Sequence, residues 1–158
     1  MSIISFIKEA GEKLFGSKTP APDAPAADVD AANKTASDAI AGYITAQNLP
    51  VDGLNVAFDG ASGIVTVGGE APDQATKEKV LLCCGNVHGV SQVDDGMTVA
   101  QPADESRWYT VVRGDTLSAI SKSQYGNANE YPKIFEANKP MLTSPDKIYP
   151  GQVLRIPA

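Results

Sequence analysis

The C-terminal third of the chain is defined by the stretch YTVVRGDTLSAIS at residues 109–121, together with IYPGQVLRIP at residues 148–157. The first stretch predicts a strand, a Gly-Asp turn and a helix from Leu117 to about Ser123, because a side-chain oxygen of the turn can cap that helix. A second helix is expected near Glu130 to Asn138, and the later stretch predicts a turn and a closing strand. Residues 108–157 are therefore expected to form a small βααβ domain.

These two stretches, with NKP at residues 138–140 between them, resemble the LysM domain from end to end. The resemblance implies a shallow groove for glycans that contain N-acetylglucosamine, between the loop after the first strand and the loop before the last. Carried onto this chain, the groove would use Gly114, Asp115, Thr116, Leu117, Ile148, Tyr149 and Pro150. Each of these residues can equally serve turn geometry or a small core, so the sequence leaves both interpretations open.

Residues 28–100 predict a second small domain. A helix from about Asp28 to Gln47 is followed by two alternating strands, a helix from Pro72 to Gly85, and a third strand over residues 90–99. This αββαβ order packs two helices on one face of a three-stranded sheet. Together with GNVHGVSQVDD at residues 85–95, it resembles a BON domain. The fold class is therefore α+β with two small domains, and the linker at residues 101–107 permits contact between them without requiring it.

Residues 1–27 precede both domains. Apolar residues at three- and four-residue steps from Ser2 to Phe15 predict an amphipathic helix over residues 1–16, and we expect it to pack on the BON domain. Residues 17–27 are rich in proline and alanine, which is typical of an extended linker. The apolar N-terminal stretch is short and is interrupted by Lys8 and Glu9. We therefore expect neither a secretory signal nor a membrane span, and a cytoplasmic location.

Composition excludes several classes of function. The net charge of -6, from 19 acidic and 13 basic residues, disfavours nucleic acid as a partner. The adjacent Cys83 and Cys84 lie in an apolar run, so we expect buried small hydrophobic residues and not a metal or redox site. His88 is expected to be a loop residue, and Asp94 and Asp95 are expected to be surface charges on opposite faces of a strand. No set of residues predicts a nucleophile, an acid–base pair or a phosphate loop, so we expect a protein that is not an enzyme.

Three further stretches are MSIISFIKEAGEKL at residues 1–14, YGNAN at residues 125–129 and IFEANKPML at residues 134–142. With these stretches, nearly the whole chain is similar to the cytoplasmic bacterial potassium-binding proteins of BON-LysM architecture. The resemblance implies a K⁺ sensor or buffer in which LysM stabilises the ion-bound conformation. A large, weakly hydrated cation suits a ring of neutral carbonyl oxygens, and the end of a helix supplies carbonyls that lack internal partners. By position against the family, the ion would be held by the backbone oxygens of Ile7, Ala10, Glu12, Gly85, Val87 and Val90.

The sequence leaves a second function open, in which LysM binds peptidoglycan and the BON domain serves as an envelope adaptor. Location inside or outside the cell separates the two functions. We expect a monomer whose partner is the potassium ion, with a glycan as partner in the second case. The chain departs from the family at its longer, proline-rich linker and at Cys83-Cys84-Gly85, where other aliphatic residues are usual.

Overall fold

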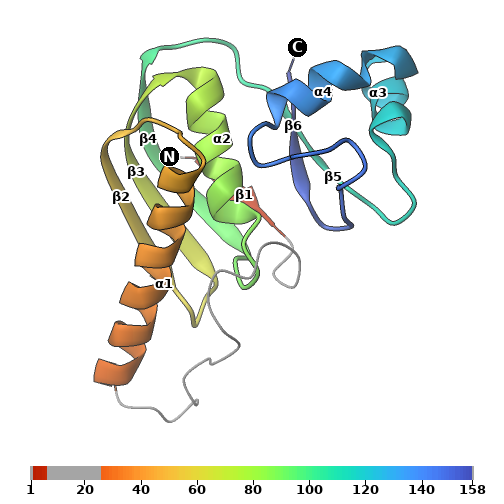
Figure 1. Cartoon of the computed structure of the whole chain (residues 1–158). Helices are drawn as coiled ribbons and strands as arrows, with labels where there is room; N and C mark the ends of the chain where they lie inside the picture. The colour runs from red at the N-terminus through yellow and green to blue at the C-terminus, as the bar shows by residue number, and fades with distance from the viewer. Residues whose placement is uncertain (1, 7–25, 158) are drawn as a thin grey trace.

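The computed structural model describes residues 2–6 and 26–157, which form two units in contact (Figure 1). The larger unit contains, in chain order, β1 (Ser2–Ser5), α1 (Ala26–Ala46), β2 (Asp52–Asp59), β3 (Ile64–Asp73), α2 (Gln74–Gly85) and β4 (Gln92–Gln101). Its four strands form one sheet in the order β1-β4-β3-β2. β3 and β4 are parallel and are joined through α2, whereas β2 and β1 pair antiparallel with β3 and β4.

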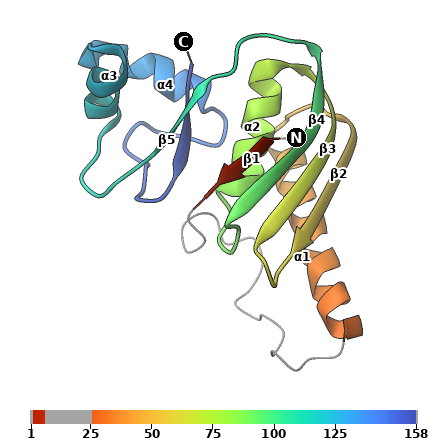
Figure 2. The same cartoon turned by 180° about the vertical axis from the view of Figure 1, so that it is seen from behind.

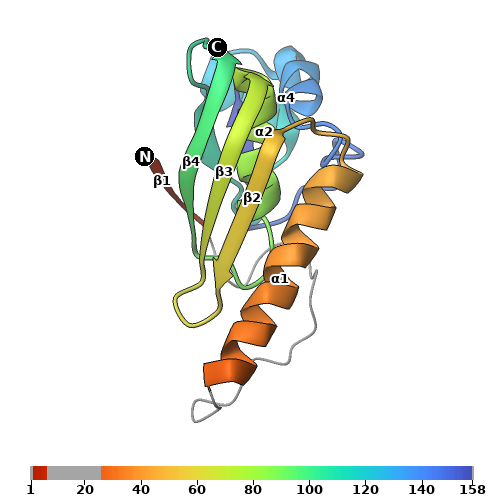
Figure 3. The same cartoon turned by 90° about the vertical axis from the view of Figure 1, so that its left-hand side faces the viewer.

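Both helices pack on one face of the sheet, and Figure 2 shows the sheet in front with α1 and α2 behind it. Val65 and Val67 of β3 and Val93 of β4 point into the core, as the alternation of the strands predicts. α1 contributes Ile40 and Ile44, which lie four residues apart on its buried side. Figure 3 shows α1 running along the β2 side of the sheet. The expected order αββαβ is therefore confirmed.

The N-terminus differs from the expected helix. Ser2–Ser5 form strand β1, which pairs with β4 so that Ile3 lies opposite Asp94 and Ile4 opposite Val93. The prediction of a helix is wrong for these residues, and the sheet has four strands where three were expected. β4 would otherwise present a row of unpaired N–H and C=O groups, and β-branched residues suit a strand that covers such an edge. Residues 7–16 of the expected helix, and the expected linker up to residue 25, lie outside the described residues.

The smaller unit contains β5 (Arg107–Thr110), α3 (Leu117–Tyr125), a 3₁₀ turn (Ala128–Glu130), α4 (Tyr131–Ala137) and β6 (Val153–Ile156). β5 and β6 pair antiparallel, so the expected βααβ order is confirmed. Thr116 caps α3 by accepting the N–H of Ala119 at 3.1 Å, and Gly126 ends it in the left-handed conformation with a φ of 76°. The core of this unit contains Val111, Leu117, Ile120, Ile134, Leu142, Leu154 and Ile156.

The two units contact each other along α2 and β6. Glu78 of α2 forms a buried salt bridge with Arg155 of β6, in which Oε1 and Nε lie 2.9 Å apart. Asn86, just after α2, binds the backbone of Val153 at the start of β6. Val153 itself packs into the core of the larger unit. The short connection at residues 101–107 therefore joins units that pack together.

Candidate functional site

The candidate ion site lies where α2 ends. Asp73 caps the start of the helix: its carboxylate accepts the N–H of Thr76 at 2.7 Å, and this hydrogen bond lowers the pKa of Asp73. Gly85 is its last residue, and the N–H of Asn86 donates to the carbonyl of Leu82 at 2.9 Å. Carbonyls in the last turn of a helix lack helical partners and carry partial negative charge. The end of α2 therefore offers backbone oxygens to a cation.

The N-terminal segment reaches this helix end through Phe6. The Phe6 side chain is 9% exposed, and its ring lies so close to Gly85 that an added Cβ would be 1.9 Å from Cζ. The N–H of Phe6 also donates to the carbonyl of Ser91 at 2.9 Å. Ile7 follows directly, so the segment that carries the first three expected ligands begins beside the loop that carries the other three. Those first three, Ile7, Ala10 and Glu12, lie outside the described residues.

The loop between α2 and β4 carries two of the other expected ligands, Val87 and Val90, shortly after Gly85 ends the helix. Val87 and Val90 are fully buried, and the N–H of Val90 donates to the carbonyl of Val87 at 3.1 Å. A carbonyl oxygen has two lone pairs, so this hydrogen bond leaves Val87 able to contact an ion as well. Ser91 donates its N–H to the carbonyl of Gly63 in the β2–β3 turn at 2.8 Å. The β2–β3 turn therefore holds one end of the loop through Ser91, and Phe6 packs at the other end beside Gly85.

Of the two acidic side chains that follow this loop, Asp95 is engaged, whereas Oδ1 of Asp94 is buried with no hydrogen-bond partner among the described residues. Asp94 and Asp95 occupy opposite faces of β4 as expected, but the prediction that both are surface charges is wrong for Asp95. Asp95 is 7% exposed, forms a salt bridge with Lys77 at 3.0 Å and accepts the N–H of Met97 at 2.9 Å. It faces α2, which supplies the opposite charge. Within residues 2–6 and 26–157, no three His, Cys, Asp or Glu side chains are grouped so that they could hold a metal ion.

The two cysteines behave as the sequence predicts. Cys83 and Cys84 are buried in α2 and are not bridged. Burial raises the pKa of Cys83 to about 12, and it raises the pKa of Cys84 well above its usual value. His88 is an exposed loop residue. The thiols therefore remain protonated and serve as part of the core.

One side of the expected glycan groove is fixed by hydrogen bonds within the smaller unit. The carboxylate of Asp115 accepts the hydroxyl of Tyr109 at 2.6 Å and the N–H of Val112 at 2.9 Å. The hydrogen bond to Asp115 raises the pKa of Tyr109. Gly114 has a φ of 92°, a turn conformation that favours glycine. Asp115 and Gly114 therefore both have a part in the turn between β5 and α3.

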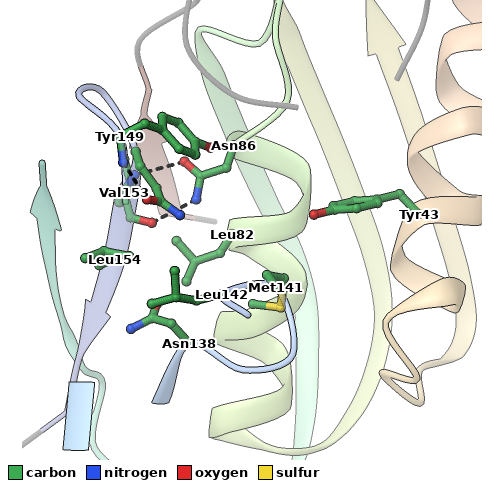
Figure 4. A pocket seen from close by; sticks show the side chains of 10 residues that line it. Tyr43, Leu82, Asn86, Asn138, Met141, Leu142, Tyr149, Val153 and Leu154 are labelled. Atoms are coloured by element: carbon green, nitrogen blue, oxygen red, sulfur yellow. Dashed lines mark hydrogen bonds between the residues drawn. The ribbon is translucent and has the colours of Figure 1, made fainter. Parts of the chain in front are cut away.

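The remaining groove residues are divided between the core, the surface and the contact between units. Thr116 caps α3, Leu117 is buried, and Ile148 packs against the same core. Tyr149 lines a small cavity between the two units (Figure 4). Pro150 is exposed. The structural interpretation of these residues is thus supported at Leu117 and Ile148, and Tyr149 is the expected groove residue that lines the cavity between the units.

The residues that join the two units are not among the sequence predictions. They are Glu78, Asn86, Ser106, Val153 and Arg155. The sequence does contain a signal for a second surface against α2, because VLLCC at residues 80–84 is apolar at consecutive positions. A helix that faces a single sheet shows an apolar stripe, whereas one that is apolar all round is buried all round.

Comparison with known proteins agrees with this architecture. The BON domain family matches residues 28–101, and the LysM domain family matches residues 109–157. Fold and sequence therefore define the class: a BON domain followed by a LysM domain. Among the described residues, no helix has both the length and the apolar character that crossing a membrane requires.

Two relatives extend the comparison beyond single domains. The Potassium binding protein Kbp of Escherichia coli O6:H1 (strain CFT073) is 49% identical over 158 residues, which cover 99% of this chain and 99% of that protein. An uncharacterized protein of Deinococcus radiodurans is 36% identical over 135 residues, or 78% of this chain and 51% of that protein. The chain belongs to the family of Kbp, which confirms the resemblance seen in its sequence.

Proposed function

We propose that this protein binds K⁺ selectively over Na⁺ and acts as a sensor or buffer of potassium. The main support is the identity to Kbp along nearly the whole chain. The observation that favours a site at the end of α2 is the contact between Phe6 and Gly85, because it brings the chain before Ile7 onto the loop that begins at Gly85.

The proposed ligands are backbone oxygens from both segments, at Ile7, Ala10, Glu12, Gly85, Val87 and Val90. Neutral carbonyls can replace the water shell of a weakly hydrated monovalent ion, whereas dense carboxylates favour divalent ions. The negative end of the α2 dipole adds to the attraction. An ion held in this way would join the N-terminal segment to the loop, so binding would tighten the conformation and could be read as a signal.

In this proposal the protein is not an enzyme, and LysM stabilises the ion-bound conformation. The packing of β6 against α2, the helix that leads into the proposed site, supports that role for LysM. We further propose that the protein acts in the cytoplasm as a monomer. Cell fractionation and sedimentation of the purified protein check these two points.

A glycan function is the alternative, and the geometry favours it less. Asp115 and Leu117 are engaged within the smaller unit, and Tyr149 lies at the contact with the larger one. Binding of the intact protein to isolated peptidoglycan would restore this alternative.

Isothermal titration of the potassium-free protein with KCl tests the proposal, with NaCl at matched ionic strength as the control. A saturable signal for K⁺ that Na⁺ does not give is the expected result. If neither salt gives saturation, or if both give the same curve, selective potassium binding is wrong.

A further inference from the structure

Asn86 lies between two of the proposed ligands, directly after the end of α2. Its backbone stands between Gly85 and Val87, while its side-chain amide reaches into the LysM unit. Nδ2 donates to the carbonyl of Val153 at 2.8 Å, and the N–H of Val153 donates to Oδ1 at 2.9 Å (Figure 4). The amide thus pairs with the first residue of β6 through both of its polar atoms.

This pair is one end of a line of contacts along α2. Glu78, Leu82 and Asn86 are spaced four residues apart and therefore lie on one side of the helix and its C-terminal end. At the far end, Glu78 pairs with Arg155 and accepts the N–H of Ser106 at 2.8 Å. Of the three residues on this line, only Asn86 belongs to the proposed ion loop.

We propose that Asn86 is a positioning residue, through which the LysM unit holds the loop from Gly85 to Val90 in the conformation that binds K⁺. This inference rests on the proposed function. Asn86 does not contact the ion in this account. It acts by fixing the direction of the two neighbouring backbone carbonyls.

The energetic argument comes from burial. Val153 is 2% exposed, and the Asn86 amide supplies a hydrogen-bond partner to both its N–H and its carbonyl. A buried polar group without a partner is costly, and the loop would shift to find other partners. Coupling between two sites is reciprocal, so K⁺ should also stabilise the pairing of Asn86 with Val153.

The test measures K⁺ affinity by calorimetric titration of the full chain, well below the melting temperature of each variant. Under those conditions a loss of stability alone does not change the affinity. For Asn86→Ala we expect the Kd for K⁺ to rise about tenfold, because two hydrogen bonds that hold the loop are lost. Asn86→Gln keeps the amide on a side chain longer by one methylene and should give an intermediate Kd; it also serves if the alanine variant does not fold.

Ser106→Ala is the matched control at the far end of the contact. It removes the hydroxyl that accepts Arg155 Nη2 at 3.2 Å, and it leaves the loop untouched. Its Kd should stay within about twofold of the unsubstituted protein. A second readout is hydrogen exchange at the Val153 N–H, which K⁺ should slow in the unsubstituted protein and not in Asn86→Ala.

The outcomes separate this inference from the proposed function. A large rise in Kd for Asn86→Ala, with Ser106→Ala unchanged, supports the positioning role. If the unsubstituted protein binds K⁺ and Asn86→Ala binds it equally well, the positioning role is wrong and the potassium function stands. Equal losses in both variants show a general loosening of the contact, which also overturns the role. If the unsubstituted protein does not bind K⁺, both proposals fail.

Discussion

Replacing Gly85 with alanine tests the contact that brings the N-terminal segment to the ion loop. The new Cβ would lie 1.9, 2.1 and 2.2 Å from three ring atoms of Phe6, so the ring must leave its place. Burying a phenylalanine side chain fully is worth about 1.5–3 kcal/mol, and helix propensity favours alanine over glycine by about 1 kcal/mol. Taking the difference, we expect Gly85→Ala to destabilise the protein by about 0.5–2 kcal/mol.

Gly42→Ala provides the matched control. Gly42 lies in α1, and a Cβ there would have no atom within 4 Å. Helix propensity should then act alone and stabilise the protein by about 0.5–1 kcal/mol. The two substitutions make the same chemical change and should have opposite signs. K⁺ affinity should fall in Gly85→Ala, because Ile7 follows the displaced Phe6, and should stay unchanged in Gly42→Ala.

Urea unfolding and K⁺ titration measure the two effects. In a Phe6→Ala background the clash is absent, so Gly85→Ala should no longer destabilise the protein, and the coupling in this double-mutant cycle gives the energy of the contact. If Gly85→Ala stabilises the protein as much as Gly42→Ala and leaves the affinity unchanged, the Phe6 contact is not what brings the N-terminal segment to the loop.

Three further predictions concern the packing of the fold. Glu78→Ala leaves Arg155 buried without its carboxylate partner and should lower the free energy of unfolding in urea by about 3–5 kcal/mol. The control, Asp38→Ala, breaks an exposed pair and should lower it by less than about 1 kcal/mol. Similar small losses in both variants would contradict a buried contact between Glu78 and Arg155. Asp73→Ala removes a helix cap and should cost about 1 kcal/mol at neutral pH. A backbone hydrogen bond lowers the pKa of Asp73 in the folded protein, so this stabilisation is present above the ordinary aspartate pKa of about 4 and is lost as the pH falls through the lowered value. Unfolding curves for Asp73→Ala and the unsubstituted protein should therefore converge in acid. A difference that persists unchanged in acid would refute the role of the Asp73 carboxylate as a cap. Cys83, with a pKa raised to about 12 by burial, should resist iodoacetamide at pH 8 in the native protein and react after unfolding, and rapid labelling of the native protein would show that α2 opens.

The LysM unit could be predicted closely from sequence because its signals are local. Three features each depend on a few neighbouring residues: a cap from the turn, which the structure assigns to Thr116, the helix that begins at Leu117, and the closing strand before Pro157. The αββαβ order of the larger unit was equally accessible, since alternation and helix ends are read over short windows. Local signals thus suffice where neighbours in sequence decide the structure.

The N-terminal strand could not be predicted in this way. Ile3, Ile4 and Phe6 fit helical spacing as well as they fit a strand, and the choice is made by the edge of β4, some ninety residues away. Asp95 is a similar case, because its salt-bridge partner Lys77 becomes known only when α2 packs on the sheet. For the ion site, the structure places Gly85 at the end of α2 and Val87 and Val90 in the loop that follows, and all six ligands stay a prediction.

The burial of α2 on more than one side links the LysM unit to the proposed ion loop. Residues 80–84 are all 3% exposed or less, and five consecutive positions cover more than one helical turn of 3.6 residues. The sheet can cover only one side of such a helix, so Leu82 on another side needs a second surface, which the LysM unit supplies at the cavity lined by Leu82 and Val153. Removing the LysM unit would expose this side of α2 to water, and the helix end at Gly85 would lose its support. If K⁺ binds at that end, as proposed above, its affinity should therefore depend on LysM, even though none of the proposed ligands belongs to LysM.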